Sequence, residues 1–228
     1  MPDRAVIFDM DGVLVDSYKP HFEAWRRTAQ QRGLTITDQQ FAACFGRTGR
    51  EFISALWSGQ VTEEQAATLD AEKEVCYRQV LEESFPEMPG ASRLLRELHR
   101  AGFALAIGSS GPPENVELVV RQLPAGSLFS ATVHGMEVNA GKPDPAVFLL
   151  AARKLGRAPY QCAVIEDAPA GIQAGRRAGM SVIALTGTGP RGKLDAAHMV
   201  VDSLLGLSAK RIAGLIDHHA AAAGKILS

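Results

Sequence analysis

Residues 4–13 read Arg4-Ala-Val-Ile-Phe-Asp9-Met-Asp11-Gly-Val13, and this stretch decides the fold. The apolar run at residues 5–8 is typical of a buried strand in a parallel sheet. Asp9 and Asp11 follow this run, and Gly12 lets the backbone turn sharply after them. Open parallel sheets bind ligands beyond the carboxyl ends of their strands, so we expect both carboxylates in one crevice. Two carboxylates placed there can bind a hard cation and share nucleophilic and acid–base work.

Taken alone, the Asp-x-Asp-Gly pattern also fits a solvated turn or half of a calcium loop. The calcium loop fails because it needs alternating oxygen ligands and a glutamate at its twelfth position. Val13 and Val15 follow instead, and residues 18–20 supply no such ligand. The solvated turn stays open on these four residues, so the rest of the chain has to decide.

The bulk composition limits the kinds of partner. The 228 residues allow one large domain or two smaller ones, and 46% hydrophobic residues suffice for a sizeable core. A net charge of −1 gives no field that would attract nucleic acid or an anionic membrane. Three scattered cysteines in apolar surroundings predict reduced core thiols. The sequence contains no secretory signal and no apolar stretch of about 18 residues, so we expect a cytoplasmic protein. We also expect a monomer or weak dimer.

From residue 87 onward, strand-like runs alternate with helical patterns. The further expected strands are 104–108, 132–134, 163–165, 182–185 and 199–201. The expected helices are 91–100, 114–122, 145–155, 170–177 and 204–216, the last followed by His218 and His219 as C-terminal caps. The alternation predicts an α/β fold with a doubly wound, Rossmann-like parallel sheet.

The segment between the first and second strands breaks this rhythm, because residues 17–86 contain no convincing strand. Apolar residues there form three helical faces, made by Phe22, Trp25 and Ala29, by residues 52–57, and by residues 69–80. A crossover between parallel strands needs little more than a dozen residues. We therefore favour an inserted helical cap domain over a long crossover. The expected domains are a core of residues 1–16 and 87–228 and a cap of residues 17–86.

Two further polar residues stand where strands are expected to end. Ser109 follows the run 104–108, and its hydroxyl with nearby backbone N–H groups could hold a phosphate oxygen. Lys142 stands between Gly141 and Pro143, which restrict the backbone, and its point charge can neutralise an anion. Each has a plainer alternative when taken alone, namely an ordinary loop and a surface lysine before a helix.

Glu166 and Asp167 form another acidic cluster at the end of an expected strand. Carboxylates placed opposite Asp9 and Asp11 would repel one another, and a magnesium ion with octahedral oxygen ligands resolves that repulsion. The alternative is a solvated helix N-cap at Asp167.

Taken in order, Asp9-Met-Asp11-Gly, Ser109, Lys142-Pro143 and Glu166-Asp167 resemble the motifs of the haloacid dehalogenase (HAD) superfamily. The resemblance spans nearly the whole chain, because one branch carries its helical cap after the first motif. That branch includes sugar-phosphate phosphatases and β-phosphoglucomutase. The resemblance implies a phosphoryl-transfer enzyme that acts on a small-molecule phosphate ester with Mg²⁺.

The resemblance also implies roles for the matching residues. Asp9 would attack phosphorus to form an aspartyl-phosphate. Asp11 would protonate the leaving oxygen and then deprotonate the attacking water. Ser109, with Ser110 beside it, and Lys142 would bind phosphoryl oxygens.

The implied metal ligands are Asp9, the backbone carbonyl of Asp11, and Asp167, with Glu166 direct or through water. The second aspartate argues for phosphoryl transfer, because dehalogenase relatives lack it. Phosphonate-cleaving relatives use a cap lysine as a Schiff base, and no match to that motif is present. A non-catalytic binding protein on the same fold would be expected to have lost a motif residue, and none is lost.

Four residues of the expected cap match the mutase-like branch, namely His21, Trp25, Arg50 and Lys73. Lys73 lies on an apolar helical face, which requires either a polar cleft or a side chain that reaches the surface. His21 is equally compatible with a core histidine, and Arg50 with an ordinary surface arginine. Together, Arg50 and Lys73 indicate recognition of an anionic part of the substrate, such as a second phosphate.

The loop after the serine motif departs from β-phosphoglucomutase, whose loop carries polar residues that hold the non-reacting phosphate. Here the loop reads Gly111-Pro112-Pro113. The loss of those donors favours a phosphatase on a small phosphorylated metabolite, with a hexose-phosphate mutase as the alternative.

Overall fold

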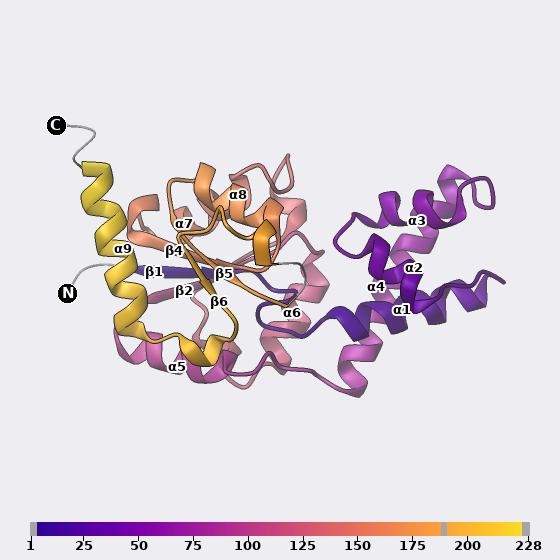
Figure 1. Cartoon of the computed structure of the whole chain (residues 1–228). Coiled ribbons are helices and arrows are strands. Elements are labelled where there is room, and N and C mark those ends of the chain that lie inside the picture. Colours follow the sequence, from indigo (N-terminus) through magenta and orange to yellow (C-terminus); the bar gives the residue numbers. More distant parts are fainter. Residues whose placement is uncertain (1–3, 188–190, 225–228) are drawn as a thin grey trace. The chain divides into compact units, whose positions relative to one another are not determined.

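The computed structural model describes residues 4–187 and 191–224 (Figure 1). The chain forms two compact units, one from Met1–Val15 with Glu87–Ser228 and the other from Asp16–Pro86. We call them the sheet unit and the helical unit.

The sheet unit is built on strands that all pair in parallel, in the order β3-β2-β1-β4-β5-β6. The strands are β1 (Ala5–Phe8), β2 (Ala104–Gly108), β3 (Ala131–Val133), β4 (Cys162–Glu166), β5 (Ser181–Leu185) and β6 (Met199–Val201). From β1 the chain winds to β2 and β3 on one side, and it then crosses to β4 on the other. The switch point of the sheet therefore lies between β1 and β4, where such folds bind their ligands. The predicted α/β doubly wound sheet is confirmed.

Helices cover both faces of this sheet. Its α-helices are α5 (Ala91–Arg100), α6 (Pro113–Gln122), α7 (Ala146–Lys154), α8 (Pro169–Arg177) and α9 (Ala209–Gly224). Short 3-10 helices are η1 (Gly126–Leu128), η2 (Gly135–Glu137), η3 (Pro159–Gln161), η4 (Arg191–Lys193) and η5 (Leu204–Gly206). Ala5 and Ile7 face α7 and α8 in one buried cluster, whereas α5 and α9 contact the sheet from its other side. Because β1 and β4 are buried on both faces, their residues are almost entirely apolar.

The C-terminal helix predicted over residues 204–216 is wrong at its start. Residues 204–206 form η5, because Ser203 Oγ accepts the Leu205 N–H and Arg93 Nη2 donates to the carbonyls of Leu204 and Leu207. The α-helix begins only at Ala209 and runs to Gly224. His218 and His219 therefore lie inside α9 and are not its C-terminal caps.

The helical unit consists of α1 (Tyr18–Gln31), α2 (Asp38–Cys44), α3 (Gly49–Trp57) and α4 (Glu63–Glu83), with α1 packed along α4. Thr37, Thr48 and Thr62 begin α2, α3 and α4 with capping boxes, each with a Gln or Glu three residues later. The predicted helical faces at residues 22–29, 52–57 and 69–80 correspond to α1, α3 and α4. The short α2 was not predicted from apolar periodicity, although the Thr37-x-x-Gln40 pattern marks its start.

The core of the helical unit is aromatic. Trp25 stacks on Phe52 with ring centroids 4.4 Å apart, and Phe41 and Trp57 complete the cluster. The Trp57 indole N–H donates to the Thr35 carbonyl at 3.2 Å, which satisfies its polar atom. These contacts give the inserted segment a hydrophobic core of its own.

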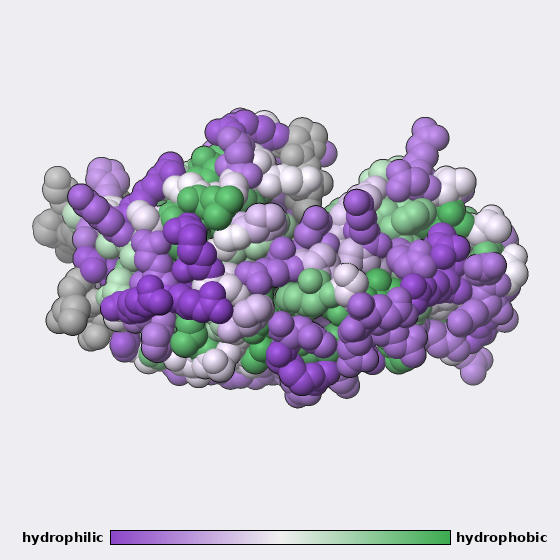
Figure 2. All heavy atoms as spheres, turned by 90° about the horizontal axis from the view of Figure 1, so that it is seen from below, coloured by the Kyte–Doolittle hydropathy of each residue, from purple (hydrophilic) through white to green (hydrophobic). Residues whose placement is uncertain are grey.

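The face drawn in Figure 2 is mostly polar. On the face drawn in Figure 2, apolar residues are scattered among hydrophilic ones rather than joined in one large patch. In the part of the chain that the structure describes, the exposed large apolar side chains are Val75, Met136, Leu149, Tyr160 and Leu205. Among the described residues, no helix combines the length and apolar character that a membrane crossing requires.

Candidate active site

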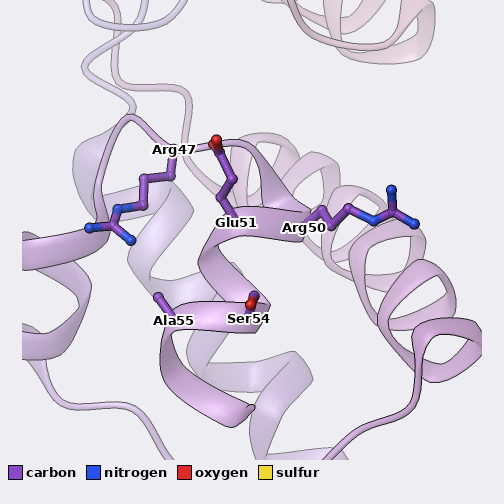
Figure 3. Close-up of a pocket in the computed structure, with 5 residues that line it drawn as sticks. All are labelled: Arg47, Arg50, Glu51, Ser54 and Ala55. Carbon is purple, nitrogen blue, oxygen red and sulfur yellow. The ribbon is translucent and has the colours of Figure 1, made fainter.

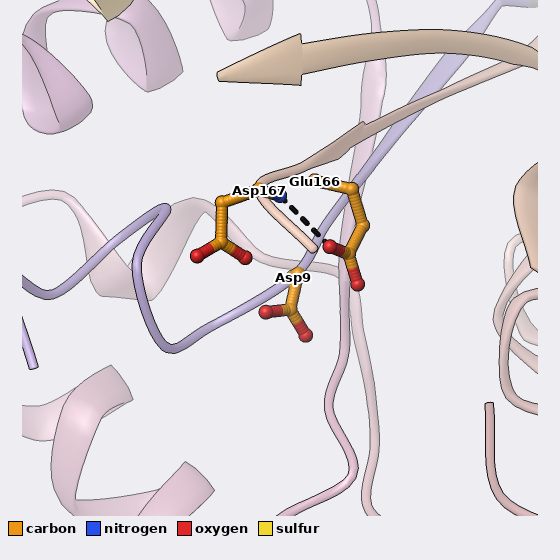
Figure 4. Close-up of side chains that lie close together, drawn as sticks. All are labelled: Asp9, Glu166 and Asp167. Atoms are coloured by element: carbon orange, nitrogen blue, oxygen red, sulfur yellow. Dashed lines mark hydrogen bonds between the residues drawn. The ribbon is translucent and has the colours of Figure 1, made fainter. Parts of the chain in front are cut away.

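The side chains of Asp9, Glu166 and Asp167 meet at the carboxyl ends of β1 and β4 (Figure 4). Phe8 pairs with Ile165 in the sheet, and the Asp9 N–H donates to the Ile165 carbonyl at 2.9 Å. One oxygen from each of the three carboxyl groups lies within 4.8 Å of the others. All three residues are buried, so the switch point of the sheet concentrates negative charge away from water.

Lys142 supplies the cation that faces these carboxylates. Its Nζ lies 2.6 Å from Asp9 Oδ1 and 2.8 Å from Glu166 Oε1, and its side chain is only 9% exposed. Two further bonds hold the loop that carries it. Asp144 Oδ1 accepts the Ala146 N–H at 2.9 Å, and Arg177 Nη1 donates to the Pro143 carbonyl at 2.9 Å. The ammonium is therefore held by two carboxylates, and the chain that follows it is held by these two bonds.

Both carboxylate oxygens of Glu166 accept hydrogen bonds from other groups of the protein. Oε1 accepts from Lys142, and Oε2 accepts the N–H groups of Asp167 and Ala168, each at 2.8 Å. Glu166 therefore holds the two residues that lead into α8, whose N-cap Ala168 has no side-chain cap. The same carboxyl group lies against Gly171, where a Cβ would overlap it. Glu166 thus links the lysine to the first turn of α8.

Gly171→Ala should lower kcat by roughly 10- to 100-fold, because the added methyl displaces Glu166 and with it the Lys142 ammonium. The measurement is steady-state turnover of p-nitrophenyl phosphate with Mg²⁺. Gly214→Ala in α9 is the matched control, since a Cβ there meets nothing within 4 Å. Equal kcat values for the two variants would show that Glu166 does not depend on the space at Gly171.

The charges of the site are unbalanced. Burial raises the pKa of Asp9 to about 7, against the lowering effect of Lys142, and the Glu166 carboxylate raises it further. The pKa of Lys142 is raised above its ordinary value by Asp9 and Glu166 in spite of burial, so the lysine stays protonated. One ammonium thus faces three buried carboxyl groups, and a divalent cation bound by oxygen ligands would restore the balance.

Asp11 follows β1 in a tight turn in which Gly12 has a φ of 76°, a left-handed conformation that favours glycine. The carboxyl group of Asp11 is not among the three that converge. Ser109, at the end of β2, is buried, and its Oγ accepts the Gly111 N–H at 3.0 Å. Ser110 beside it is exposed. Of the residues predicted for this site, the structure brings Asp9, Lys142, Glu166 and Asp167 into one cluster.

In the helical unit, His21 and Lys73 lie against the ring of Tyr77, and Lys73 also lies near the ring of Trp25. The His21 ring stacks on Tyr77 at 3.9 Å, and Lys73 Nζ lies 5.2 Å from the Tyr77 ring and 5.6 Å from the Trp25 ring. Lys73 is buried and pairs with Glu74 Oε1 at 2.8 Å. The sequence analysis named neither Tyr77 nor Glu74, although Tyr77 follows Lys73 at the i, i+4 spacing of one helical face.

Arg50 takes a different position. Its exposed side chain pairs with Glu63, and it lines a pocket formed by Arg47, Arg50, Glu51, Ser54 and Ala55. Figure 3 shows the side chains of Arg47 and Arg50 pointing in opposite directions. The two guanidinium groups therefore do not converge on one point.

Known proteins resemble this chain over most of its length. Hexitol phosphatase A of Escherichia coli (strain K12) is 33% identical over 203 residues, which cover 88% of this chain and 91% of that protein. β-Phosphoglucomutase of Bacillus subtilis (strain 168) is 33% identical over 205 residues, 87% of this chain and 88% of that protein. The crystal structure of β-phosphoglucomutase from Clostridium difficile matches with a TM-score of 0.80 at 26% identity, over 95% of this chain and 98% of that one.

A family model described as haloacid dehalogenase-like hydrolase matches residues 4–179. This span includes all four motifs and the carboxylate cluster between β1 and β4. The chain belongs to the haloacid dehalogenase-like hydrolases.

Proposed function

We propose that this protein is a Mg²⁺-dependent phosphatase that acts on a small phosphorylated metabolite, most simply a sugar phosphate. One observation carries the proposal: the ammonium of Lys142, whose side chain is only 9% exposed, lies within hydrogen-bond distance of Asp9 at the switch point of the sheet. This arrangement combines a carboxylate nucleophile with a fixed positive charge for the phosphoryl oxygens. The relatives named above include a sugar-alcohol phosphatase and a sugar-phosphate mutase.

The residues at the site fit Mg²⁺. The family generally uses this ion, and the three carboxyl groups offer the hard oxygen donors that it prefers. We propose Asp9, the backbone carbonyl of Asp11, and Asp167 as its ligands. Glu166, whose oxygens already serve Lys142 and the start of α8, would act on the ion through an intervening water. When bound, Mg²⁺ supplies positive charge to the phosphoryl oxygens.

The chemistry then requires two displacements at phosphorus. An Asp9 oxygen attacks phosphorus, the ester P–O bond breaks, and Asp11 gives its proton to the departing oxygen. Asp11 then takes a proton from water, which attacks phosphorus and releases Asp9 and inorganic phosphate. Lys142 and Ser109 hold the phosphoryl oxygens through both steps.

We propose that the helical unit serves as the cap that selects the substrate. The cluster of His21, Trp25, Lys73 and Tyr77 supports this role, because it places a charged hydrogen-bonding group beside aromatic rings in this unit. His21 and Lys73 would contact the non-reacting part of the substrate, while Trp25, which lies in the aromatic core, would fix Lys73. Ser110 would contribute at the phosphoryl group. The assignment of Arg50 as a substrate contact remains a prediction.

A hexose-phosphate mutase is the second candidate, favoured by the likeness to the Bacillus subtilis enzyme. A mutase must hold a second phosphate while it returns the first. The loop before α6 has Pro112 at the N-cap, with no side-chain cap, and Pro113 as the first helical residue. Two successive prolines remove two N–H donors from this loop, which supports the phosphatase.

The test is a phosphate-release screen over sugar mono- and bisphosphates with Mg²⁺. The screen includes β-glucose 1-phosphate, primed with a bisphosphate and assayed for glucose 6-phosphate. Steady phosphate release from one or a few sugars is the expected result. Isomerisation with little release would show a mutase, and no turnover of any ester, including p-nitrophenyl phosphate, would revive a non-catalytic binding protein.

Adding Mg²⁺ at about 100 times its Kd should stabilise the folded protein by about 2.7 kcal/mol, or roughly 5–10 °C in Tm for a chain of this length. The gain arises because the ion relieves repulsion among the converging carboxylates. Thermal unfolding with EDTA and with Mg²⁺ measures it. Asp167→Asn should remove most of the shift, whereas the exposed Asp202→Asn should retain it. A full shift in Asp167→Asn would place the ion elsewhere.

A further inference from the structure

The cation at the centre of the helical unit's polar cluster is already neutralised. Lys73 Nζ lies 2.8 Å from Glu74 Oε1, and the lysine side chain is only 6% exposed. The rings of Trp25 and Tyr77 flank it. A buried ammonium paired at this distance offers hydrogen bonds but little net charge to a ligand.

A second carboxyl group lies close by. Asp70 is on the turn of α4 before Lys73 and Glu74, and its carboxyl group fills the space that Gly49 leaves open at the start of α3, where a Cβ would overlap it. Burial raises the pKa of Asp70, and the negative charge of Glu74 raises it further, while Lys73 lowers it. Carboxyl groups therefore outnumber the ammonium in this cluster.

The arginines of α3 and of the loop before it do not compensate. Arg50 pairs with Glu63, and the pocket that Arg47 and Arg50 line also contains Glu51. Since the two guanidinium groups point away from each other (Figure 3), they form no cradle for a phosphate. Lys73 and Arg50 are thus each already paired with an acid.

We infer that Glu74 makes the enzyme selective for phosphate monoesters whose remainder is uncharged and hydroxyl-bearing, and that it disfavours bisphosphates. The inference rests on the proposed phosphatase and on the proposed role of the helical unit as its cap. A second phosphate carries a charge of about −1.5 to −2 and would meet an acidic cluster, which is repulsive. Sugar hydroxyls suit the same groups, because Lys73 can donate to them and Glu74 can accept from them.

The test compares kcat/KM for two pairs of substrates, glucose 6-phosphate with glucose 1,6-bisphosphate and fructose 1-phosphate with fructose 1,6-bisphosphate. The natural protein should prefer the better monophosphate over its bisphosphate by about tenfold or more. Glu74→Gln leaves the Lys73 charge uncompensated. This substitution should reduce the ratio of kcat/KM for the monophosphate to kcat/KM for the bisphosphate about tenfold, mainly through a lower KM for the bisphosphate. Turnover of p-nitrophenyl phosphate, which has no second phosphate, normalises each variant for active enzyme.

Two further variants separate this role from a general change of charge. Glu72→Gln removes one carboxylate from the same helix, where it pairs with Arg32, and should leave the ratio unchanged. Asp70→Asn keeps the Lys73–Glu74 pair and should lower the ratio in the same direction as Glu74→Gln, which covers the case in which Glu74→Gln does not fold.

A natural protein that hydrolyses p-nitrophenyl phosphate but accepts the bisphosphates equally well would overturn the inference and leave the phosphatase standing. So would a ratio unchanged in both Glu74→Gln and Asp70→Asn. The absence of turnover with every ester would instead overturn the proposed function, and the inference with it.

Discussion

Asp9→Asn should lower kcat by roughly 10⁴-fold or more and abolish formation of a phosphoenzyme. The amide has nearly the shape of the carboxylate, and its oxygen can still accept from Lys142, so the fold around the site should persist. What the amide loses is the negative oxygen that attacks phosphorus. The measurement is phosphate release with Mg²⁺ from the best substrate of the screen.

Asp217→Asn is the matched control for Asp9→Asn. Asp217 is an exposed aspartate that pairs with Arg4 at 2.7 Å, so its substitution should leave kcat within about twofold. Residual turnover in Asp9→Asn above about one hundredth of the natural rate would contradict the assignment of Asp9 as the nucleophile.

Lys142→Met should lower kcat by roughly 10²- to 10³-fold. The side chain keeps most of its apolar stem but loses the ammonium that holds Asp9 and Glu166. These two buried carboxyl groups would then face each other without a cation, so the pKa of Asp9 should rise further. The same loss should destabilise the folded protein by roughly 3 kcal/mol, because a buried ion pair is broken.

Lys154→Met provides the comparison for Lys142→Met. Lys154 is a more exposed lysine on α7 that pairs with Glu137 at 2.5 Å, and its loss should change kcat by at most a few-fold. Turnover and thermal unfolding of both variants are measured together. If the two variants behaved alike, Lys142 would have no special part in holding the phosphoryl group.

The sheet and the acidic cluster could be predicted from the sequence because two simple patterns determine them. Fully buried parallel strands are uninterrupted apolar runs, and residues 5–8 and 104–108 are found as predicted. The topology then brings the ends of β1 and β4 together, so Asp9 and Glu166 meet without any special side-chain geometry. Some strands were predicted one or two residues too short or shifted along the chain. An example is the prediction of 163–165 for β4 (Cys162–Glu166), because the apolar signal is weak at strand ends.

Features that depend on individual side-chain partners were not predictable. The amphipathic pattern of residues 204–216 hid the start of α9, since it carries no sign that Arg93 binds the carbonyls of η5. The sequence analysis singled out Lys73 from its match to the mutase-like branch and its place on an apolar helical face. Neither signal shows its pairing with the neighbouring Glu74, which depends on rotamers. The hydrogen bonds that Glu166 accepts from the N–H groups of Asp167 and Ala168 likewise depend on the backbone turn into α8.

The most direct test of the account is to identify the labelled residue in enzyme quenched with acid during turnover of a radiolabelled sugar monophosphate with Mg²⁺. The account predicts steady release of labelled inorganic phosphate and a labelled peptide that contains Asp9, with the label lost under alkaline conditions as expected for an acyl phosphate. A label on a peptide that lacks Asp9, or steady phosphate release with undiminished turnover in Asp9→Asn, would contradict it.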